Sequence, residues 1–396
     1  MHQQSPRQTQ TPKHFRKIVD AANIFPWLLS FSFLCVIMMA ARFLRASKEK
    51  GTASPESSTP SHEPIIAILP FRNENNTLKK TLPAIASEVS RDENSKLILV
   101  DSNSEDGGAI TAAEIMKNSE LNANSWLIIS VDLPGKGKAL NAAMDLVKKD
   151  EIVVLIDADA IIPDGSFESF RRWMASSDVG AVSAEEHISK DHPMKEYKER
   201  ANILRRYEST LGCCLILEGS LLAWHPSRIG WKRFDESTNA DDAQISLLSI
   251  RSGHRSIVDS SIKYADCRNI SVGSFERSIR RSQGLIKQLI SNRDIFWSSE
   301  SNSTRISLFF NYLLHIVTPW CVLLLFITPI YFLFIANPTQ FFINHEAKLL
   351  LASFFLALSS FSRICKTLIK GTIASVISQI RLVFGISSHQ WEPGKG

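Results

Sequence analysis

Two aspartates, Asp157 and Asp159, follow a short apolar segment and are separated only by Ala158. The segment before them, Ile152–Ile156, is aliphatic and largely β-branched, which predicts a buried strand. Side chains alternate along a strand, so carboxylates two residues apart point the same way. Such a pair can hold a hard divalent cation and leave room for phosphate oxygens. A solvated Asp-x-Asp turn is the alternative, and the triplet alone does not separate the two.

The sequence around this strand alternates between strand-like and helix-like patterns. This order predicts an α/β fold with a parallel βαβ sheet and the potential to bind a nucleotide. The sequence contains no G-x-G-x-x-G and no G-x-x-x-x-G-K-[ST] motif, which argues against a dinucleotide cofactor and P-loop chemistry. We expect strands at residues 65–70, 96–101, 126–131 and 152–156, and helices at residues 75–90, 107–118 and 138–149.

Polar residues cluster where the predicted strands end. Each block on its own can be explained as turn chemistry or a helix cap. In an open α/β sheet, however, ligands bind at the carboxyl ends of the strands. Several polar blocks in series at that edge therefore indicate a binding site. The blocks are PFRNEN (70–75), DSNSEDGG (101–108), GKGKALN (135–141) and DADA (157–160).

Apolar residues gather toward the two ends of the chain. Residues 25–44 form a run long enough to span a bilayer, in which Arg42 is expected to snorkel to the interface. A cleaved signal peptide is the alternative, but the long polar lead of residues 1–24 argues against it. Residues 307–336 include two prolines, so this second predicted span is expected to be tilted or broken. The mixture of apolar and small polar residues at 372–386 predicts an amphipathic helix that lies in the membrane interface.

Lysine and arginine near the ends of these segments indicate the topology. The distribution favours a cytosolic central domain and a cytosolic C-terminus, while the basic residues of the N-terminal tail conflict with an external tail. The expected parts are a polar tail (1–24), a transmembrane helix (25–44), a linker (45–63), a globular domain (64–292), transmembrane helices (307–336 and 347–364), and an interfacial helix with a cytosolic tail (365–396).

Composition narrows the class of protein further. The net charge of +5 is spread out, and no basic stripe with interleaved aromatics supports nucleic-acid binding. The six cysteines lack metal-ligand spacing and suit a reducing compartment.

In order and spacing, the polar blocks resemble those of membrane-bound family-2 glycosyltransferases, which are inverting enzymes with a GT-A (Rossmann-like) nucleotide-sugar-binding domain. The resemblance covers about residues 64–292 and is specific as a set. The chain departs from the family pattern where Arg277 replaces a glutamine and Arg281 a tryptophan, which argues against a processive enzyme. Trp224 and His225 stand where the family has an arginine or lysine.

The resemblance implies a role for each matching residue. Asp157 and Asp159 would hold Mg²⁺ or Mn²⁺ at the donor diphosphate. Asp242, in the segment NADDA (239–243), would be the general base, and Arg280 would contact the diphosphate. A helix cap is the alternative for Asp241, but it leaves Asp242 unexplained. The remaining implied nucleotide-sugar-binding residues are Pro70, Asn73, Glu74, Asp101, Lys138 and Asn141.

The expected function is that of a membrane-anchored inverting glycosyltransferase. It would move a sugar from a nucleoside-diphosphate sugar, with uridine the family's commoner nucleoside, to a lipid-linked or amphiphilic acceptor at the cytosolic leaflet. A processive polysaccharide synthase is the first alternative. A catalytically inactive membrane protein that binds nucleotide sugars is the second. A nucleotidyltransferase with the same βαβ start is also conceivable, but it would not need the Asp242 segment.

Overall fold

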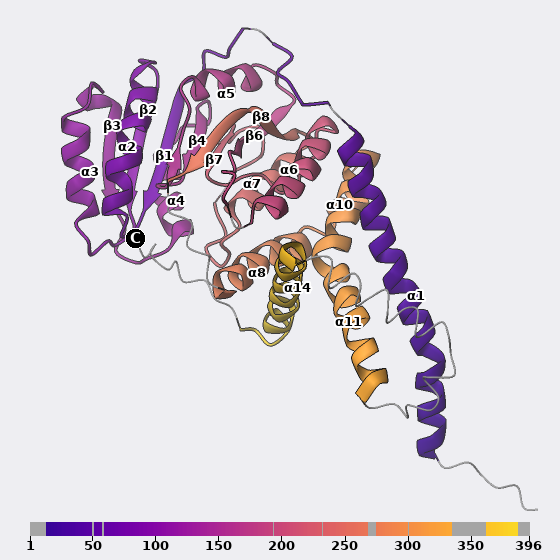
Figure 1. The fold of residues 1–396 in the computed structure, drawn as a ribbon. Coiled ribbons are helices and arrows are strands. Elements are labelled where there is room, and N and C mark those ends of the chain that lie inside the picture. Colours follow the sequence, from indigo (N-terminus) through magenta and orange to yellow (C-terminus); the bar gives the residue numbers. More distant parts are fainter. Residues whose placement is uncertain are drawn as a thin grey trace, which may run out of the picture.

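An eight-stranded sheet forms the core of the globular part of the molecule (Figure 1). The computed structural model describes residues 13–49, 51–57, 59–192, 194–231, 233–267, 275–299, 301–334 and 362–386. The strand order is β3-β2-β1-β4-β7-β6-β8-β5. The strands are β1 (Ile65–Phe71), β2 (Lys96–Asp101), β3 (Trp126–Ser130), β4 (Ile152–Ile156), β5 (Ala160–Ile161), β6 (Val179–Glu186), β7 (Leu221–Trp224) and β8 (Arg255–Asp266).

The first four strands are parallel, as the βαβ pattern predicts. Strand β7 then pairs antiparallel with both β4 and β6, so the direction changes in the middle of the sheet. The carboxyl ends of β1, β2 and β4 therefore meet at one edge, where the polar blocks follow them.

Helices cover both faces of the sheet because the buried strands are apolar on both sides. In β1, Ile65, Ala67 and Leu69 belong to one core cluster, while Ile66 and Ile68 belong to the other. The first cluster is completed by helices α2, α3 and α5, and the second by α4 and α7. These helices are α2 (Asn75–Ser90), α3 (Gly108–Lys117), α4 (Lys136–Met144), α5 (Ser166–Met174) and α7 (Asp241–Arg251).

The remaining helices connect this domain to an elongated helical part (Figure 1). Helix α1 runs beside α11, α6 packs on β8, and α14 packs on α8. They are α1 (Lys13–Lys48), α6 (Lys195–Thr210), α8 (Phe275–Ser291), α9 (Ile295–Ser298), α10 (Asn302–Tyr312), α11 (Thr318–Phe334) and α14 (Ser362–Val383).

The predicted elements of the first half are confirmed, with one error in α4. The helix begins at Lys136 and ends at Met144, whereas residues 138–149 were expected. It ends early because the chain turns back toward β4, and the Glu151 carboxylate accepts from the Lys148 N–H at 2.7 Å.

Within the described ranges, two helical segments are long and apolar enough to cross a membrane, judged by length and composition alone: Trp27–Lys48 and Asn302–Thr328. They overlap the first two expected spans. The second is not broken: α10 continues into α11 through a π-helical turn, Leu313–Val317, so the helix is irregular there but uninterrupted. Helix α1 continues to Lys48, four residues into the expected linker. The expected span 347–364 lies outside the described residues except for its last three positions.

Arg42 does not snorkel to the interface, because α1 packs against α6 and α10 at this point. Its Nη2 donates to Ser307 Oγ at 3.2 Å and lies 3.7 Å from Glu208 Oε1. Its guanidinium carbon is 4.5 Å from the centre of the Tyr207 ring. Glu208 Oε1 also accepts from Asn311 Nδ2 at 2.8 Å. Arg42, Glu208, Ser307 and Asn311, here called the junction cluster, thus tie three helices together.

Candidate active site

The loops after β1 and β2 are bonded to each other. Asn73 adopts a left-handed φ of 52°, which asparagine tolerates better than most residues. Its N–H donates to Ser104 Oγ at 3.0 Å, and its Oδ1 accepts from the Glu105 N–H at 2.7 Å. Asp101 Oδ1 accepts from the Ser104 N–H at 3.1 Å. The two loops therefore form one rigid edge beside the end of β1.

Pro70 and Glu74 lie at the same edge. Pro70 is buried within β1, in register with Val100 of β2. Glu74 is also buried, and its Oε2 accepts from Thr77 Oγ1 at 2.6 Å. Each has a local packing or hydrogen-bonding role in addition to its position at the site.

Helix α4 is held by hydrogen bonds just before its first residue and again at Asn141, within the helix. The Gly135 N–H donates to Ser102 Oγ at 3.0 Å, which fixes the loop before the helix to the end of β2. Asn141 is buried, and its amide donates to Phe234 O and to Glu236 Oε1. Asn141 Oδ1 also accepts from the Phe234 N–H at 2.8 Å. Asn141 thus positions the segment that leads into α7.

Lys136 joins two acidic blocks that are far apart in the sequence. Its Nζ lies 2.7 Å from Asp157 Oδ1 and 3.0 Å from Asp241 Oδ2. Burial alone would lower the pKa of Lys136, but the two carboxylates outweigh it and raise the pKa above its usual value. Lys136 belongs to the block GKGKALN (135–141), but the family resemblance implied no role for it. The nearby Lys138 was assigned to the donor, and its side chain packs along Gly135.

Asp242 lies beside the segment that precedes β7. A Cβ added at Gly219 would stand 3.5 Å from the Cβ of Asp242, an ordinary van der Waals distance, so Gly219 lies directly against Asp242. The next residue, Ser220, donates from Oγ to Asp157 Oδ2 at 3.1 Å. Residues 219–220 therefore connect the Asp157 side of the site with the Asp242 side.

The electrostatic surroundings of Asp242 favour its protonated form. Burial and the like charge of Asp241 raise the pKa of Asp242 to about 7, against the opposing effects of the Ala243 N–H, Lys136 and Arg205. The Ala243 N–H donates to Asp242 Oδ1 at 2.7 Å. A carboxylate with a pKa near neutrality is well suited to accept and release a proton.

Arg205 of α6 holds the segment that precedes β7 in place. It bonds to Glu218, and its Nε donates to Ile216 O at 3.0 Å. Sequence reasoning missed this arginine, because the signal for it is a contact between α6 and the loop before β7. His225 does not replace the family's missing cation here: it is buried and bonds to Glu63 and Ser227.

Helix α8, which carries Arg280, passes next to the acidic site, here defined as Lys136, Asp157, Asp241 and Asp242. A Cβ added at Gly284 would lie 3.3 Å from Ala240 Cβ, so α8 crosses closely over the start of α7. Arg280 stands four residues before Gly284 and therefore shares its helix face. Asp159 is buried, and its backbone O accepts from the Cys267 N–H at 2.9 Å.

The acidic site is suited to a cation that is shared with a ligand. Among the described residues, no three histidine, cysteine or acidic side chains are grouped to hold a metal ion. Asp157 and Asp159 lie in a turn after β4 and not within the strand, since the Ala160 N–H donates to Asp157 O at 3.0 Å, so the strand alternation expected for them does not apply. Their carboxylates are hard oxygen donors, and Mg²⁺ is often held by one or two carboxylates together with substrate phosphates. The Lys136 ammonium already stands between two carboxylates as a positive charge. The donor set therefore fits a divalent ion bound jointly with a diphosphate.

Residues 66–215 match the protein family described as Glycosyl transferase family 2. This segment contains the blocks from Pro70 to Asp159 and ends before Asp242 and Arg280. No curated protein matches the sequence.

Solved structures support the fold. The mannosyltransferase PcManGT from Pyrobaculum calidifontis, in complex with GDP-Man and Mn²⁺, is 20% identical with a TM-score of 0.73, covering 90% of this chain and 99% of that chain. TarS from S. aureus is 13% identical with a TM-score of 0.44, covering 64% and 42%. Glucosyl-3-phosphoglycerate synthase from Mycobacterium tuberculosis, in complex with phosphoglyceric acid, is 18% identical with a TM-score of 0.40, covering 58% and 80%. Of these three, PcManGT alone is similar enough to support the fold.

The match to PcManGT extends beyond the central domain. Residues 64–292 are 229 of 396 residues, or about 58%, so a coverage of 90% must include flanking helices. The curled α/β sheet has a GT-A-like fold. Within it, residues 66–215 match the family-2 glycosyltransferase model, in line with the sequence resemblance.

Proposed function

We propose that this chain is a membrane-anchored inverting glycosyltransferase. It transfers a sugar from a nucleoside-diphosphate sugar to a lipid-linked or amphiphilic acceptor at the cytosolic leaflet. The proposal is carried by one observation: Lys136 Nζ lies within 3.0 Å of both Asp157 and Asp241. The end of β4 and the residue next to Asp242 therefore belong to one site, as a reaction between donor and acceptor requires.

The donor would lie along the carboxyl ends of β1, β2 and β4. Asp101, Asn73, Glu74 and Pro70 would hold the base and ribose, since their loops form one rigid edge there. Uridine is the commoner nucleoside in the family, whereas the similar PcManGT structure contains GDP-Man. Both nucleosides therefore belong in a substrate screen.

Asp157 and Asp159 would hold Mg²⁺ or Mn²⁺ together with the donor diphosphate. As a Lewis acid, the ion would stabilise the charge on the leaving diphosphate. Arg280 and Lys138 would donate charge-assisted hydrogen bonds to the same diphosphate, each worth about 1.5–3 kcal/mol. The α4 residue Asn141 would act indirectly, through the segment that leads into α7.

Asp242 would take the proton of the acceptor hydroxyl as it attacks the anomeric carbon. Its raised pKa of about 7 matches the role of a general base near neutral pH. A single displacement from the face opposite the diphosphate inverts the anomeric centre. No covalent sugar–enzyme bond is needed, so no second carboxylate has to act as a nucleophile.

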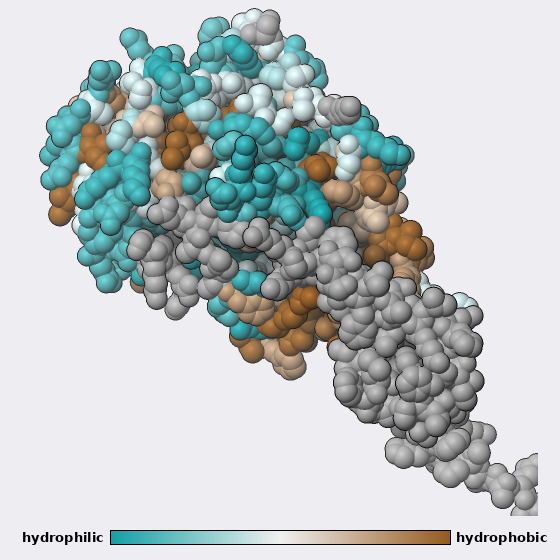
Figure 2. Space-filling model, viewed as in Figure 1, coloured by the Kyte–Doolittle hydropathy of each residue, from teal (hydrophilic) through white to brown (hydrophobic). Residues whose placement is uncertain are grey.

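Exposed apolar side chains support the membrane location. They line the part of α1 that is long enough to span a bilayer, and they recur around the end of α14, where Figure 2 shows brown residues below the hydrophilic domain. A membrane anchor would raise the effective concentration of a lipid acceptor at the site. These residues include Trp27, Leu28, Phe31, Leu34 and Ile37 on α1, and Ile373, Ile380, Val383, Phe384 and Ile386 at α14.

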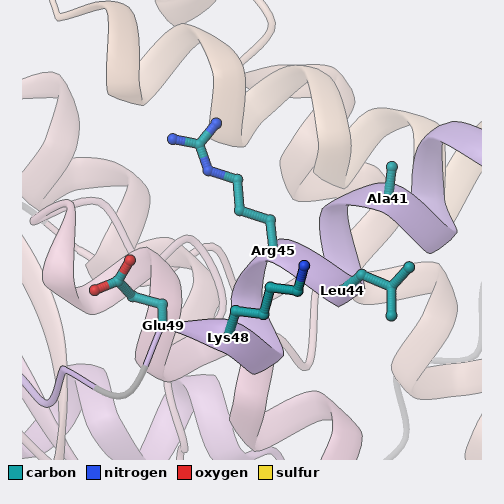
Figure 3. A pocket seen from close by; sticks show the side chains of 5 residues that line it. All are labelled: Ala41, Leu44, Arg45, Lys48 and Glu49. Carbon is teal, nitrogen blue, oxygen red and sulfur yellow. The ribbon is translucent and has the colours of Figure 1, made fainter.

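The cytosolic end of α1 suits a membrane surface as well. Figure 3 shows a shallow depression there, lined by Ala41, Leu44, Arg45, Lys48 and Glu49, in which the two cationic side chains project from the helix. Basic residues at this position are typical of the cytosolic end of a span and attract anionic headgroups.

The test is a screen of UDP- and GDP-sugars with the full chain in detergent, with and without a cell lipid extract. Release of nucleoside diphosphate should require Mg²⁺ or Mn²⁺ and should increase when the acceptor lipid is present. Asp159→Ala should lose nucleotide binding and release together, whereas the exposed control Asp164→Asn should behave like the wild type. Absence of release with every donor would favour an inactive binding protein, and a long polymeric product would favour a processive synthase.

A further inference from the structure

Lys136 occupies the centre of the acidic site. Its side chain is 19% exposed, and the side chains of Asp157 and Asp241 are 27% and 11% exposed. All three charges are therefore largely withdrawn from water, where Coulomb interactions are stronger than at the surface. With its ammonium between two carboxylates, the cluster carries a single net negative charge.

We propose that Lys136 is an internal counter-cation that competes with the divalent ion for Asp157, so that the metal binds together with a diphosphate and only weakly by itself. This inference rests on the proposed function, because it concerns the same metal and donor site. It assigns Lys136 the role of a positioning residue that couples metal binding to donor binding.

The competition follows from the number of oxygen ligands. Without a donor, a divalent ion would have to displace the ammonium from Asp157, and the described residues offer no group of three metal-binding side chains. A diphosphate supplies further oxygens for the ion and negative charge for the displaced ammonium. Binding of the donor therefore favours the divalent ion over the Lys136 ammonium as the partner of Asp157.

The backbone that carries Lys136 is fixed, so its side chain can change partners alone. A Cβ added at the next residue, Gly137, would lie 3.1 Å from the Cα of Glu236, which places the first turn of α4 against that loop. Asn141 bonds to Phe234 and Glu236 one turn later. The flexible four-carbon stem of lysine then lets the ammonium move from Asp157 to a nearby phosphate oxygen.

The experiment measures Mn²⁺ binding to the full chain in detergent from the electron paramagnetic resonance signal of free Mn²⁺. Titrations are made without nucleotide, with UDP and with GDP. Wild type should bind Mn²⁺ at least about tenfold more tightly when the matching diphosphate is present, a change of about 1.4 kcal/mol. K136Q and K136A should bind Mn²⁺ alone about tenfold more tightly than wild type and gain less from the diphosphate.

Three controls separate the possible causes. K136R keeps the positive charge and should retain weak binding of Mn²⁺ alone. K149Q removes an exposed lysine after α4 and should match wild type. D159A should lose Mn²⁺ binding under all conditions.

Two outcomes would overturn the inference. If K136Q and K136A bind Mn²⁺ alone as weakly as wild type while D159A abolishes binding with nucleotide, the metal site is real and Lys136 does not compete for it. The proposed function would then stand. If wild type binds no Mn²⁺ with either nucleotide, the metal-dependent function and this inference both fail.

Discussion

The acidic site and the junction cluster each hold buried or half-buried charges, but their partners differ in kind. In the junction cluster, Arg42 and Glu208 have side chains only 5% and 9% exposed, and Glu208 accepts from Asn311 and from the Leu215 N–H. In the acidic site, Asp157 is 27% exposed, and its partners are the tip of a lysine and the hydroxyl of Ser220.

This difference is the one expected between a structural ion pair and the proposed ligand site. The partners in the junction cluster come from three helices that these side chains join, so no small molecule can exchange them without separating α1, α6 and α10. The partners of Asp157 sit on a flexible side chain and a half-exposed hydroxyl, both of which a ligand can replace. Substitutions in the first cluster should therefore change stability, and substitutions in the second should change catalysis.

The largest effect is expected for Asp242→Asn. The amide has nearly the same shape but cannot accept the acceptor's proton, so the transfer rate should fall about 10²–10⁴-fold. Donor affinity should remain close to that of wild type, because Asp242 is assigned to the acceptor side. Single-turnover transfer and nucleotide titration measure the two quantities separately. The thermal midpoint should not fall, since burial already disfavours the charged form of Asp242.

The control for this substitution is Asp164→Asn, at an exposed carboxylate that pairs with Arg91. It should leave transfer and stability unchanged. An equal loss of donor binding and transfer in Asp242→Asn would show that the general base has been assigned to the wrong residue.

Arg42→Met tests the junction cluster. It leaves Glu208 buried without its cation, and breaking a buried ion pair costs about 3–5 kcal/mol. Burial raises the pKa of Glu208 to about 7 even though Arg42, the Leu215 N–H and Asn311 act in the opposite direction. Protonation of Glu208 would absorb part of the cost, so the lower end of the range is expected. Denaturant unfolding in detergent measures the free energy.

The matched control is Arg45→Met, one turn along α1, where the arginine is exposed. An exposed substitution of this kind should change the free energy of unfolding by less than about 0.5 kcal/mol. If the two variants are equally stable, Arg42 is an interfacial anchor and the contrast between the two clusters is lost.

Much of the fold could be predicted from the sequence because its signals are local. Alternating strand and helix patterns located β1 to β4 and their helices, and polar residues after each strand located the edge of the site. The end of α4 was predicted wrongly, since it depends on the Glu151 carboxylate capturing a backbone N–H. The positions of Lys136 and Arg42 depend on partners distant in the chain. Helical periodicity also cannot distinguish a face that meets lipid from one that meets protein.

The pH dependence of the reaction provides a sharper test of the acidic site. Burial and the charge of Asp241 raise the pKa of Asp242 to about 7, and only the carboxylate can accept a proton. The value of kcat/KM should therefore fall about tenfold per pH unit below about pH 7 and level off above it. Asp241→Asn removes the like charge, so it should move this midpoint to lower pH. A wild-type midpoint near pH 4 would contradict the assignment of Asp242 as a buried general base with a raised pKa.

The smallest effect is expected for Ser220→Ala. The substitution removes the hydrogen bond from Ser220 Oγ to Asp157 Oδ2. Hydrogen bonds to charged groups contribute about 1.5–3 kcal/mol, and partial exposure of both residues favours the lower value. Donor KM should rise about tenfold with kcat nearly unchanged, because Asp157 would orient the diphosphate less well. Ser261→Ala removes a similar bond to Asp259, away from the site, and should leave KM unchanged. A large fall in kcat in Ser220→Ala would instead mean that Ser220 acts on the transition state, and the hydroxyl would then be a fixed catalytic partner and not an exchangeable one.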